Sequence, residues 1–314
     1  MPILIWLLGW SLASQLMHGY TPIGGRFQYV KPDVTDHHRL LDRFAGQIPE
    51  GAALATFASL YPHLSHREAI YRFPILADAT YVLIDAAAQS GWTRHPQEIR
   101  DQIAAMLGSG QWAVQDASDG YLLLRADPEA RPTTIADLPA EFFTFAKSAD
   151  SPQVPLDIGF APPGSEEVRL KLLGYDVIDR PQWRETAFRF YWQIPPGVKA
   201  KLPPELNLRA FFLTPDGREV DSTDLRPLMQ SFWYPPDRWQ PGETVITDKL
   251  PWFMPREYAI AMGVTQSADW EDQASRWRVV KATPTAVQPP QSFENNTWIR
   301  TGTVSYTHLR AHET

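Results

Sequence analysis

The residues best suited to bind a ligand are His63, Ser65, His66 and Arg67, which lie close together in the sequence. Arginine presents a planar fork of donors that matches a phosphate, and imidazole and hydroxyl groups add further donors and acceptors. We therefore predict that this loop binds a phosphate or the hydroxyl groups of a sugar. The alternative is that the same side chains bond to neighbouring backbone and hold the loop rigid between two strands.

The pair His63 and His66 has the i, i+3 spacing that can bring two imidazoles onto one zinc ion. No third ligand follows at a characteristic spacing, and the chain contains no cysteine. We therefore expect no metal site. The sequence also lacks a G-x-S-x-G elbow, a P-loop and a dinucleotide-binding fingerprint, so we predict no cofactor and assign no catalytic residue.

Two further groups of side chains are candidates for ligand contact. Asp85 ends an apolar strand, and ligands gather at the carboxyl ends of parallel strands, although capping a following helix is the simpler role for this carboxylate. Trp233, Tyr234 and Trp239 lie in a proline-rich loop, where their rings would suit a stacking platform for a sugar. We predict glycan stacking at these three residues.

Residues 37–127 alternate between helical and strand patterns. Apolar residues at helical spacing predict helices near 37–45 and 96–107. Short apolar runs predict strands at 53–57, 70–73, 80–85, 111–115 and 120–125. The last two strands are joined by a tight turn that contains Asp119 and Gly120, which is typical of a hairpin. This region is predicted to be a small α/β domain.

The pattern changes after residue 127. Five prolines predict a linker over 128–155. Beyond it, apolar and polar residues alternate in short runs that are separated by turn signals such as the Pro-Asp-Gly sequence at 215–217. This pattern predicts an antiparallel β-sandwich over residues 156–284. The predicted fold class is therefore α+β with several domains.

The two ends of the chain differ from the rest. Residues 1–20 contain no charged side chain, and Trp6, Trp10 and Tyr20 favour a membrane interface. We predict that residues 1–24 are the last transmembrane helix of a truncated membrane domain, with a lipid bilayer as the partner of residues 1–20. A signal peptide is one alternative, but residues 1–20 have no basic n-region. A buried helix of a soluble protein is another, but the stretch has no polar face.

Residues 285–314 are predicted to form a disordered tail. From about Thr303 onward the tail resembles a translated sequencing adapter, so it is excluded from the fold prediction. The net charge of −7 gives no electrostatic reason to expect a nucleic-acid partner.

Several motifs in order resemble a known family. They are 18–22 (HGYTP), 61–67 (YPHLSHR), 70–74 (IYRFP), 79–85 (ATYVLID) and 119–125 (DGYLLLR). Together they resemble the predicted bacterial membrane proteins grouped as domain of unknown function 2079, which look related to polytopic GT-C type glycosyltransferases that use lipid-linked sugars. More weakly, the motifs at 173–176 (LGYD), 190–193 (FYWQ) and 239–243 (WQPGE) resemble the accessory β-sandwich of some such transferases.

The resemblance implies a place in the cell and a class of partner. It implies a protein of the cell membrane whose soluble domains are extracytoplasmic, and a lipid-linked sugar or glycan as a partner. The catalytic carboxylate of GT-C enzymes lies upstream of anything that matches here, so the chain would be a non-catalytic C-terminal portion. A membrane-anchored or secreted glycan-binding sandwich is the alternative function, and a secreted hydrolase is a third.

Overall fold

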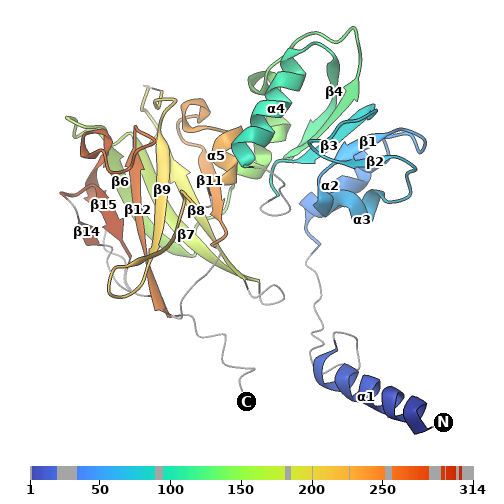
Figure 1. Cartoon of the computed structure of the whole chain (residues 1–314). Coiled ribbons are helices and arrows are strands. Elements are labelled where there is room, and N and C mark those ends of the chain that lie inside the picture. Colours follow the sequence, from blue (N-terminus) through green and yellow to red (C-terminus); the bar gives the residue numbers. More distant parts are fainter. Residues whose placement is uncertain are drawn as a thin grey trace.

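The computed structural model describes residues 2–19, 34–88, 95–180, 185–199, 201–225, 227–251, 257–282, 291–293, 295–301 and 304–305. The N-terminal helix α1 (Pro2–His18) stands apart from the other elements, which form two lobes (Figure 1). The first lobe combines helices with a mixed five-stranded sheet, and the second consists mainly of antiparallel sheets. The predicted α+β class is confirmed.

The predicted membrane-spanning helix is not found. A helix forms where it was expected, but α1 has 17 residues, and no helix in the described part of the chain is both long and apolar enough to cross a membrane. The prediction reached residue 24, and residues 20–24 lie outside the described residues.

The sheet of the first lobe has the strand order β2-β1-β3-β5-β4. Its strands are β1 (Leu54–Thr56), β2 (Ile70–Arg72), β3 (Tyr81–Asp85), β4 (Trp112–Ser118) and β5 (Tyr121–Ala126). Its helices are α2 (Asp36–Ala45), η1 (Ala58–Leu60), α3 (Tyr61–Leu64) and α4 (Pro96–Gly108). Strand β1 is parallel to β2 and β3, while β5 is antiparallel to β3 and β4. The predicted helices and strands of 37–127 are therefore confirmed.

Strands β3 and β5 are buried on both faces, so each face of the sheet must be covered by a helix. On one face Leu83 and Leu123 pack with Phe44 of α2, and on the other Ile84 and its neighbours pack with Ile103 of α4. Alternate residues of a strand point to opposite sides of its sheet, so a continuous apolar run must be covered twice. Helix α2 therefore lies on one side of the sheet and α4 on the other.

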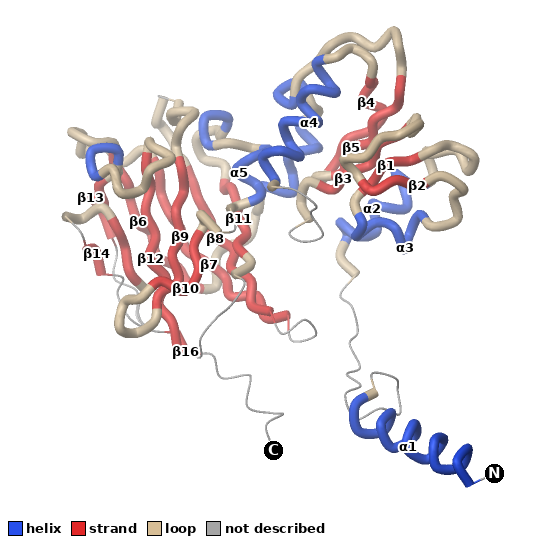
Figure 2. Tube along the Cα trace, viewed as in Figure 1, coloured by secondary structure: helices blue, strands red, loops and turns tan. Residues whose placement is uncertain are grey.

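The second lobe contains two antiparallel sheets, as the sequence predicted. One has the strand order β11-β8-β7-β6-β13, and the other has the order β10-β9-β12-β15-β14, with β16 paired to β12 (Figure 2). The strands are β6 (Val154–Ala161), β7 (Leu170–Arg180), β8 (Glu185–Gln193), β9 (Asn207–Leu213), β10 (Glu219–Ser222), β11 (Thr244–Lys249), β12 (Glu257–Thr265), β13 (Arg278–Ala282), β14 (Gln291–Phe293), β15 (Trp298–Arg300) and β16 (Val304–Ser305). Large side chains such as Phe188, Trp192 and Phe212 are buried in the core of this lobe.

Residues 128–155 do not form the exposed linker that their prolines predicted. They contain η2 (Ile135–Asp137) and η3 (Ala140–Ala146), and the side chains of Phe142, Phe143 and Phe145 are buried. Phe142 meets Trp233 of the short helix α5 (Met229–Trp233) edge-on, with ring centroids 5.9 Å apart. The prolines break regular helix here, but the phenylalanines still pack, so this segment joins the cores of the two lobes.

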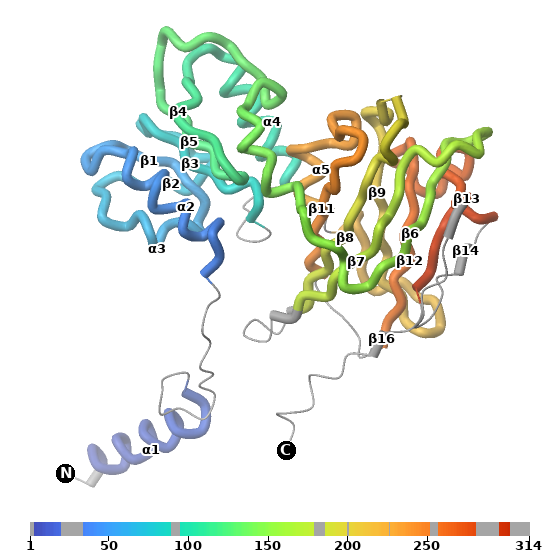
Figure 3. The backbone as a smooth tube through the Cα atoms, turned by 180° about the vertical axis from the view of Figure 1, so that it is seen from behind, coloured from blue at the N-terminus to red at the C-terminus, as the bar shows by residue number. Residues whose placement is uncertain are grey.

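The junction continues into the sandwich by backbone pairing. The amide of Ser148 donates to the carbonyl of Thr244 at 3.1 Å, and Lys147 forms an antiparallel β-bridge with Val245. Helices α4 and α5 lie side by side where the lobes meet, which is visible from both sides (Figures 1 and 3). The short helices at 236–238 (η4, Pro236–Arg238) and 273–275 (η5, Gln273–Ser275) complete the second lobe.

The sandwich extends past residue 284, where the predicted tail begins. Strand β15 pairs with β12, and its Trp298 and Ile299 are buried. Its side chains alternate over only three residues, which is too short for a pattern to stand out in the sequence. The adapter-like region from about 303 lies largely outside the described residues, apart from Val304 and Ser305 in β16.

Candidate functional site

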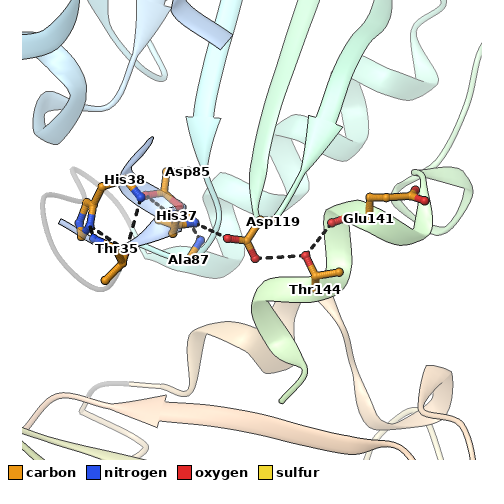
Figure 4. Close-up of polar contacts among 8 residues, drawn as sticks. All are labelled: Thr35, His37, His38, Asp85, Ala87, Asp119, Glu141 and Thr144. Atoms are coloured by element: carbon orange, nitrogen blue, oxygen red, sulfur yellow. Dashed lines mark hydrogen bonds and ion pairs between the residues drawn. The ribbon is translucent and has the colours of Figure 1, made fainter. Parts of the chain in front are cut away.

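A histidine held between two carboxylates lies at one end of the first lobe's sheet. The Nδ1 atom of His37 is 2.8 Å from Oδ2 of Asp119, and its Nε2 atom is 3.3 Å from Oδ2 of Asp85 (Figure 4). The imidazole stacks on the ring of Tyr121, with centroids 4.5 Å apart and planes 13° apart. We call His37, Asp85 and Asp119 the histidine clamp.

Three separate elements bring the clamp together. His37 is in the first turn of α2, whose N-cap Thr35 accepts a hydrogen bond from the amide of His38. Asp85 is the last residue of β3, and its Oδ1 atom accepts a hydrogen bond from the amide of Ala87 at 2.8 Å. In this bond Asp85 caps a turn, much as the sequence suggested that it would cap a helix, although no helix follows directly.

Asp119 comes from the hairpin turn between β4 and β5. Asp119 and Gly120 have φ angles of 48° and 84°, and positive φ at both central positions is the requirement of a type I′ turn. The turn is anchored to η3, because the amide of Asp119 donates to the carbonyl of Glu141 and that of Gly120 to the carbonyl of Phe142. The Thr144 hydroxyl lies 3.1 Å from Oδ1 of Asp119 (Figure 4). The clamp is thus tied to the junction between the lobes.

The geometry favours a doubly protonated His37. A neutral imidazole can donate from only one nitrogen, whereas both nitrogens of His37 face a carboxylate oxygen. Burial by itself lowers the pKa of His37, but hydrogen bonds and charge interactions with Asp119 and Asp85 outweigh it and raise the pKa to about 10. The hydrogen bond from His37 lowers the pKa of Asp119. An imidazolium between two carboxylates is therefore the state at neutral pH.

Such a clamp is poorly suited to acid–base catalysis. A general base must be unprotonated and a general acid must release its proton near the working pH, and a pKa of about 10 meets neither condition at neutral pH. The nearby Thr144 hydroxyl contacts Asp119 and the carbonyl of Glu141 rather than His37. The arrangement instead joins α2 to the sheet and to the lobe junction by charge-assisted hydrogen bonds.

The predicted loop at His63, Ser65, His66 and Arg67 lies elsewhere in the first lobe. The guanidinium of Arg67 donates from Nη2 to the carbonyl of Ile48 at 2.9 Å and from Nη1 to the carbonyl of Pro49. The other three side chains are exposed. The two bonds of Arg67 anchor the loop to backbone, which was the alternative to ligand binding in the sequence analysis. Phosphate or sugar binding at this loop stays a prediction.

We expect Arg67→Lys to lower the free energy of unfolding by about 1 kcal/mol, because one ammonium cannot span two carbonyls as a guanidinium does. The measurement is a urea unfolding midpoint for the wild type and the variant. His63→Gln is the matched control, since this exposed side chain should leave the midpoint unchanged. Equal midpoints for Arg67→Lys and the wild type would show that the anchoring is unimportant.

The three aromatic residues predicted to stack on a glycan are buried. Trp233, Tyr234 and Trp239 expose between 1% and 5% of their surface. Phe143 lies 5.4 Å from the ring of Tyr234, and the Trp239 indole donates to the Tyr234 carbonyl at 2.9 Å. In this arrangement they fill the junction between the lobes, so glycan stacking on them stays a prediction that would require the junction to open.

Sequence reasoning missed His37 and Asp119. His37 is 48 positions from Asp85 and 82 positions from Asp119, so no local spacing connects them. One signal was available: the Asp-Gly turn predicted a hairpin, and a hairpin beside β3 places Asp119 at the end of the sheet where Asp85 lies. Within the described residues, no group of three or more histidine, cysteine or acidic side chains is arranged to hold a metal ion.

Comparisons with known proteins locate a family match in the first lobe. Residues 25–123 match the family described as "Predicted membrane protein (DUF2079)", which implies association with a membrane. The match includes all three members of the histidine clamp. No curated protein and no solved structure matches the chain. The motifs noted in the sequence predicted this outcome: over residues 25–123 the chain matches the model of the DUF2079 family of predicted membrane proteins.

Proposed function

We propose that the chain is the extracytoplasmic, C-terminal portion of a polytopic membrane protein resembling glycosyltransferases that use lipid-linked sugars, and that it acts as a non-catalytic support next to the membrane. The extracytoplasmic side and the connection to lipid-linked sugars derive from the resemblance of the sequence motifs. The membrane-proximal position derives from the surface of α1, which is the observation that carries the proposal.

Helix α1 exposes nearly all of its apolar side chains. Ten large apolar residues between Ile3 and Met17 each expose between 48% and 76% of their surface. An exposed apolar surface of this kind is costly in water and marks a site that contacts a membrane or another protein. Because α1 contains no charged residue, burial against lipid or against other membrane helices is the environment that fits it.

The histidine clamp supports the proposed role as a non-catalytic support. Helix α2 is the first described element after α1 that packs on the sheet, and His37 in its first turn holds it there. The clamp would therefore keep the start of the first lobe rigid against its sheet. The protonated clamp provides no general base for catalysis at neutral pH, which agrees with a supporting role.

Because these 314 residues contain no cysteine, a cysteine introduced into either lobe reports the side of the membrane once the labelling of the unsubstituted protein has been subtracted. Ser59→Cys and Lys199→Cys each introduce a single thiol at an exposed position, one in each lobe. In cells that make the protein from its natural gene, we expect a small membrane-impermeant maleimide to label both variants without lysis. Ala187→Cys, at a fully buried position, is the control that should react only after denaturation. Labelling of the exposed variants only after lysis would place the lobes in the cytoplasm and contradict the proposal.

A further inference from the structure

A lysine and an aspartate meet inside the core of the second lobe. Nζ of Lys249, the last residue of β11, lies 2.6 Å from Oδ1 of Asp221 in β10. The two side chains expose 0% and 1% of their surface. Among the described strands, β11 and β10 each stand at the edge of their sheet, so the contact links the two sheets of the sandwich along one side. We call Lys249 and Asp221 the buried pair.

The register of both sheets explains why these two residues meet. Lys249 lies opposite Phe188 where β11 pairs with β8. Asp221 lies opposite Phe212 where β10 pairs with β9. Directly opposite residues of an antiparallel pair point to the same face of the sheet. The two phenylalanine rings meet across the core, with centroids 4.8 Å apart, and the polar residues beside them are brought face to face in the same way.

The contact differs from an ordinary salt bridge in its direction. Nζ of Lys249 donates a hydrogen bond to the carbonyl of Ser222, and its 2.6 Å approach to Oδ1 does not have the direction of a hydrogen bond. In a partly exposed pair of the first sheet, by contrast, Nζ of Lys171 donates directly to Oδ1 of Asp157 at 2.8 Å. An amine this close to a carboxylate oxygen is also near the carboxylate carbon, and reacting atoms are poised for attack at about 3–3.5 Å.

The surroundings favour a reaction that removes both charges. Taking an ammonium and a carboxylate out of water carries a desolvation penalty that can exceed the attraction between them. An amide in the same place is neutral. Well-oriented groups within one molecule react as if their concentration were about 10⁵–10⁸ M, and the exclusion of water opposes the reverse hydrolysis.

We propose that Lys249 and Asp221 condense to an intramolecular amide that joins the two sheets covalently. The ammonium passes one proton to the carboxylate, and the freed amine attacks Cγ of Asp221. The Nζ–Cγ bond forms, one C–O bond and one further N–H bond break, and the oxygen leaves as water. An ammonium and a carboxylate thus become one amide and one water molecule, which conserves atoms and charge and needs no oxidant, reductant or co-reactant.

The amide would stabilise the second lobe as a disulfide stabilises other proteins, in a chain whose 314 residues contain no cysteine. It would close a loop that contains α5 and η4, which lie between the two residues in the sequence. Closing a loop restricts the unfolded chain and so favours the folded state. The proposal goes beyond the supporting function and does not depend on the side of the membrane on which the lobes lie.

The test is the intact mass of the folded full chain, purified in detergent and compared with the mass calculated from its sequence. We expect most of the wild type to be lighter by one molecule of water. Trypsin should then fail to cut after Lys249, because its side chain no longer carries a charge. Digestion should instead release one branched peptide, in which Nζ of Lys249 is joined to a segment that contains Asp221, and tandem mass spectrometry identifies the junction.

Three variants connect the loss of water to the buried pair, each compared with its own calculated mass. Lys249→Met and the double variant Lys249→Met with Asp221→Leu should keep their full mass. Lys171→Met, which alters the other lysine–aspartate pair, should lose water as the wild type does. Thermal melting confirms that each variant is folded. The apolar double variant keeps the test valid if the single variant is not, because replacing a buried ion pair by apolar residues is often neutral or stabilising.

The proposal is overturned if the folded wild type has its full mass, which would show that the buried pair is an ion pair only. It is also overturned if either folded variant without Lys249 is still lighter by one water.

Discussion

Replacing His37 with glutamine is expected to lower the free energy of unfolding at pH 7 by about 2–4 kcal/mol. Removing one partner of a buried ion pair costs about 3–5 kcal/mol, and the partial exposure of this one reduces the figure. The His37 side chain is 22% exposed, and the variant leaves Asp85 and Asp119 without the cation between them. Urea unfolding of the wild type and the variant provides the measurement.

His38→Gln is the matched control for this experiment. His38 is one position away, is exposed, and belongs to the capping box with Thr35. Glutamine is a usual third residue of a capping box, so this variant keeps the cap and should change the free energy of unfolding by less than about 0.5 kcal/mol. If the two variants lose the same stability, the clamp contributes nothing beyond an ordinary helix start.

The pH dependence of stability follows from the same residue. The pKa of His37 is about 10 in the folded chain and 6.5 is its ordinary value, so between these two values only the folded state holds the proton. The contribution of His37 is therefore fully present below pH 6.5 and is lost as the pH rises through about 10. The loss approaches about 1.4 kcal/mol per pH unit at most. Because other groups also change their charge at high pH, the quantity to follow is the difference in free energy of unfolding between the wild type and His37→Gln. This difference should shrink as the pH rises through about 10.

The second large effect is expected for Phe142→Ala at the junction of the lobes. The Phe142 side chain is fully buried, and its ring lies 5.0 Å from that of Phe143 and 5.9 Å from that of Trp233. Truncating a buried phenylalanine to alanine typically costs about 3–5 kcal/mol, because the lost contacts leave a cavity. The same change should loosen the junction, so limited proteolysis should cut residues 128–155 in the variant while sparing them in the wild type.

Glu141→Ala provides the control for the junction, since it changes the neighbouring exposed side chain of the same helix. This variant should unfold at the wild-type urea concentration and keep the protease resistance of the segment. Rapid cleavage of the wild type between 128 and 155 would instead show that the segment is a linker, as its prolines first suggested.

The first lobe could be predicted well because its patterns are local and strong. Apolar residues at helical spacing located α4, and the Asp119-Gly120 pair located the hairpin, since only a few residue types accept the positive φ angles of its turn. The continuous apolar run of β3 predicted burial on both faces, which the packing of α2 and α4 confirms.

The candidate site could not be predicted, because it depends on which strands are neighbours. Asp85 and Asp119 meet only because β3 pairs with β5, and His37 reaches them only because α2 packs across that pair. Residues 128–155 show a similar limit: prolines exclude regular helix, but they do not prevent Phe142 and Phe143 from packing. The strand at Trp298 is stabilised by its pairing with β12 rather than by any pattern of its own.

The most direct test of the histidine clamp is the pKa of His37 itself. It can be measured by following the imidazole carbon and nitrogen shifts of labelled protein between pH 5 and pH 11, with His37→Gln used to assign the signals. A charged clamp predicts that His37 remains protonated through pH 8 and titrates near 10. Titration of His37 near its ordinary pKa of 6.5 would contradict the account, because a neutral imidazole could not hold both Asp85 and Asp119.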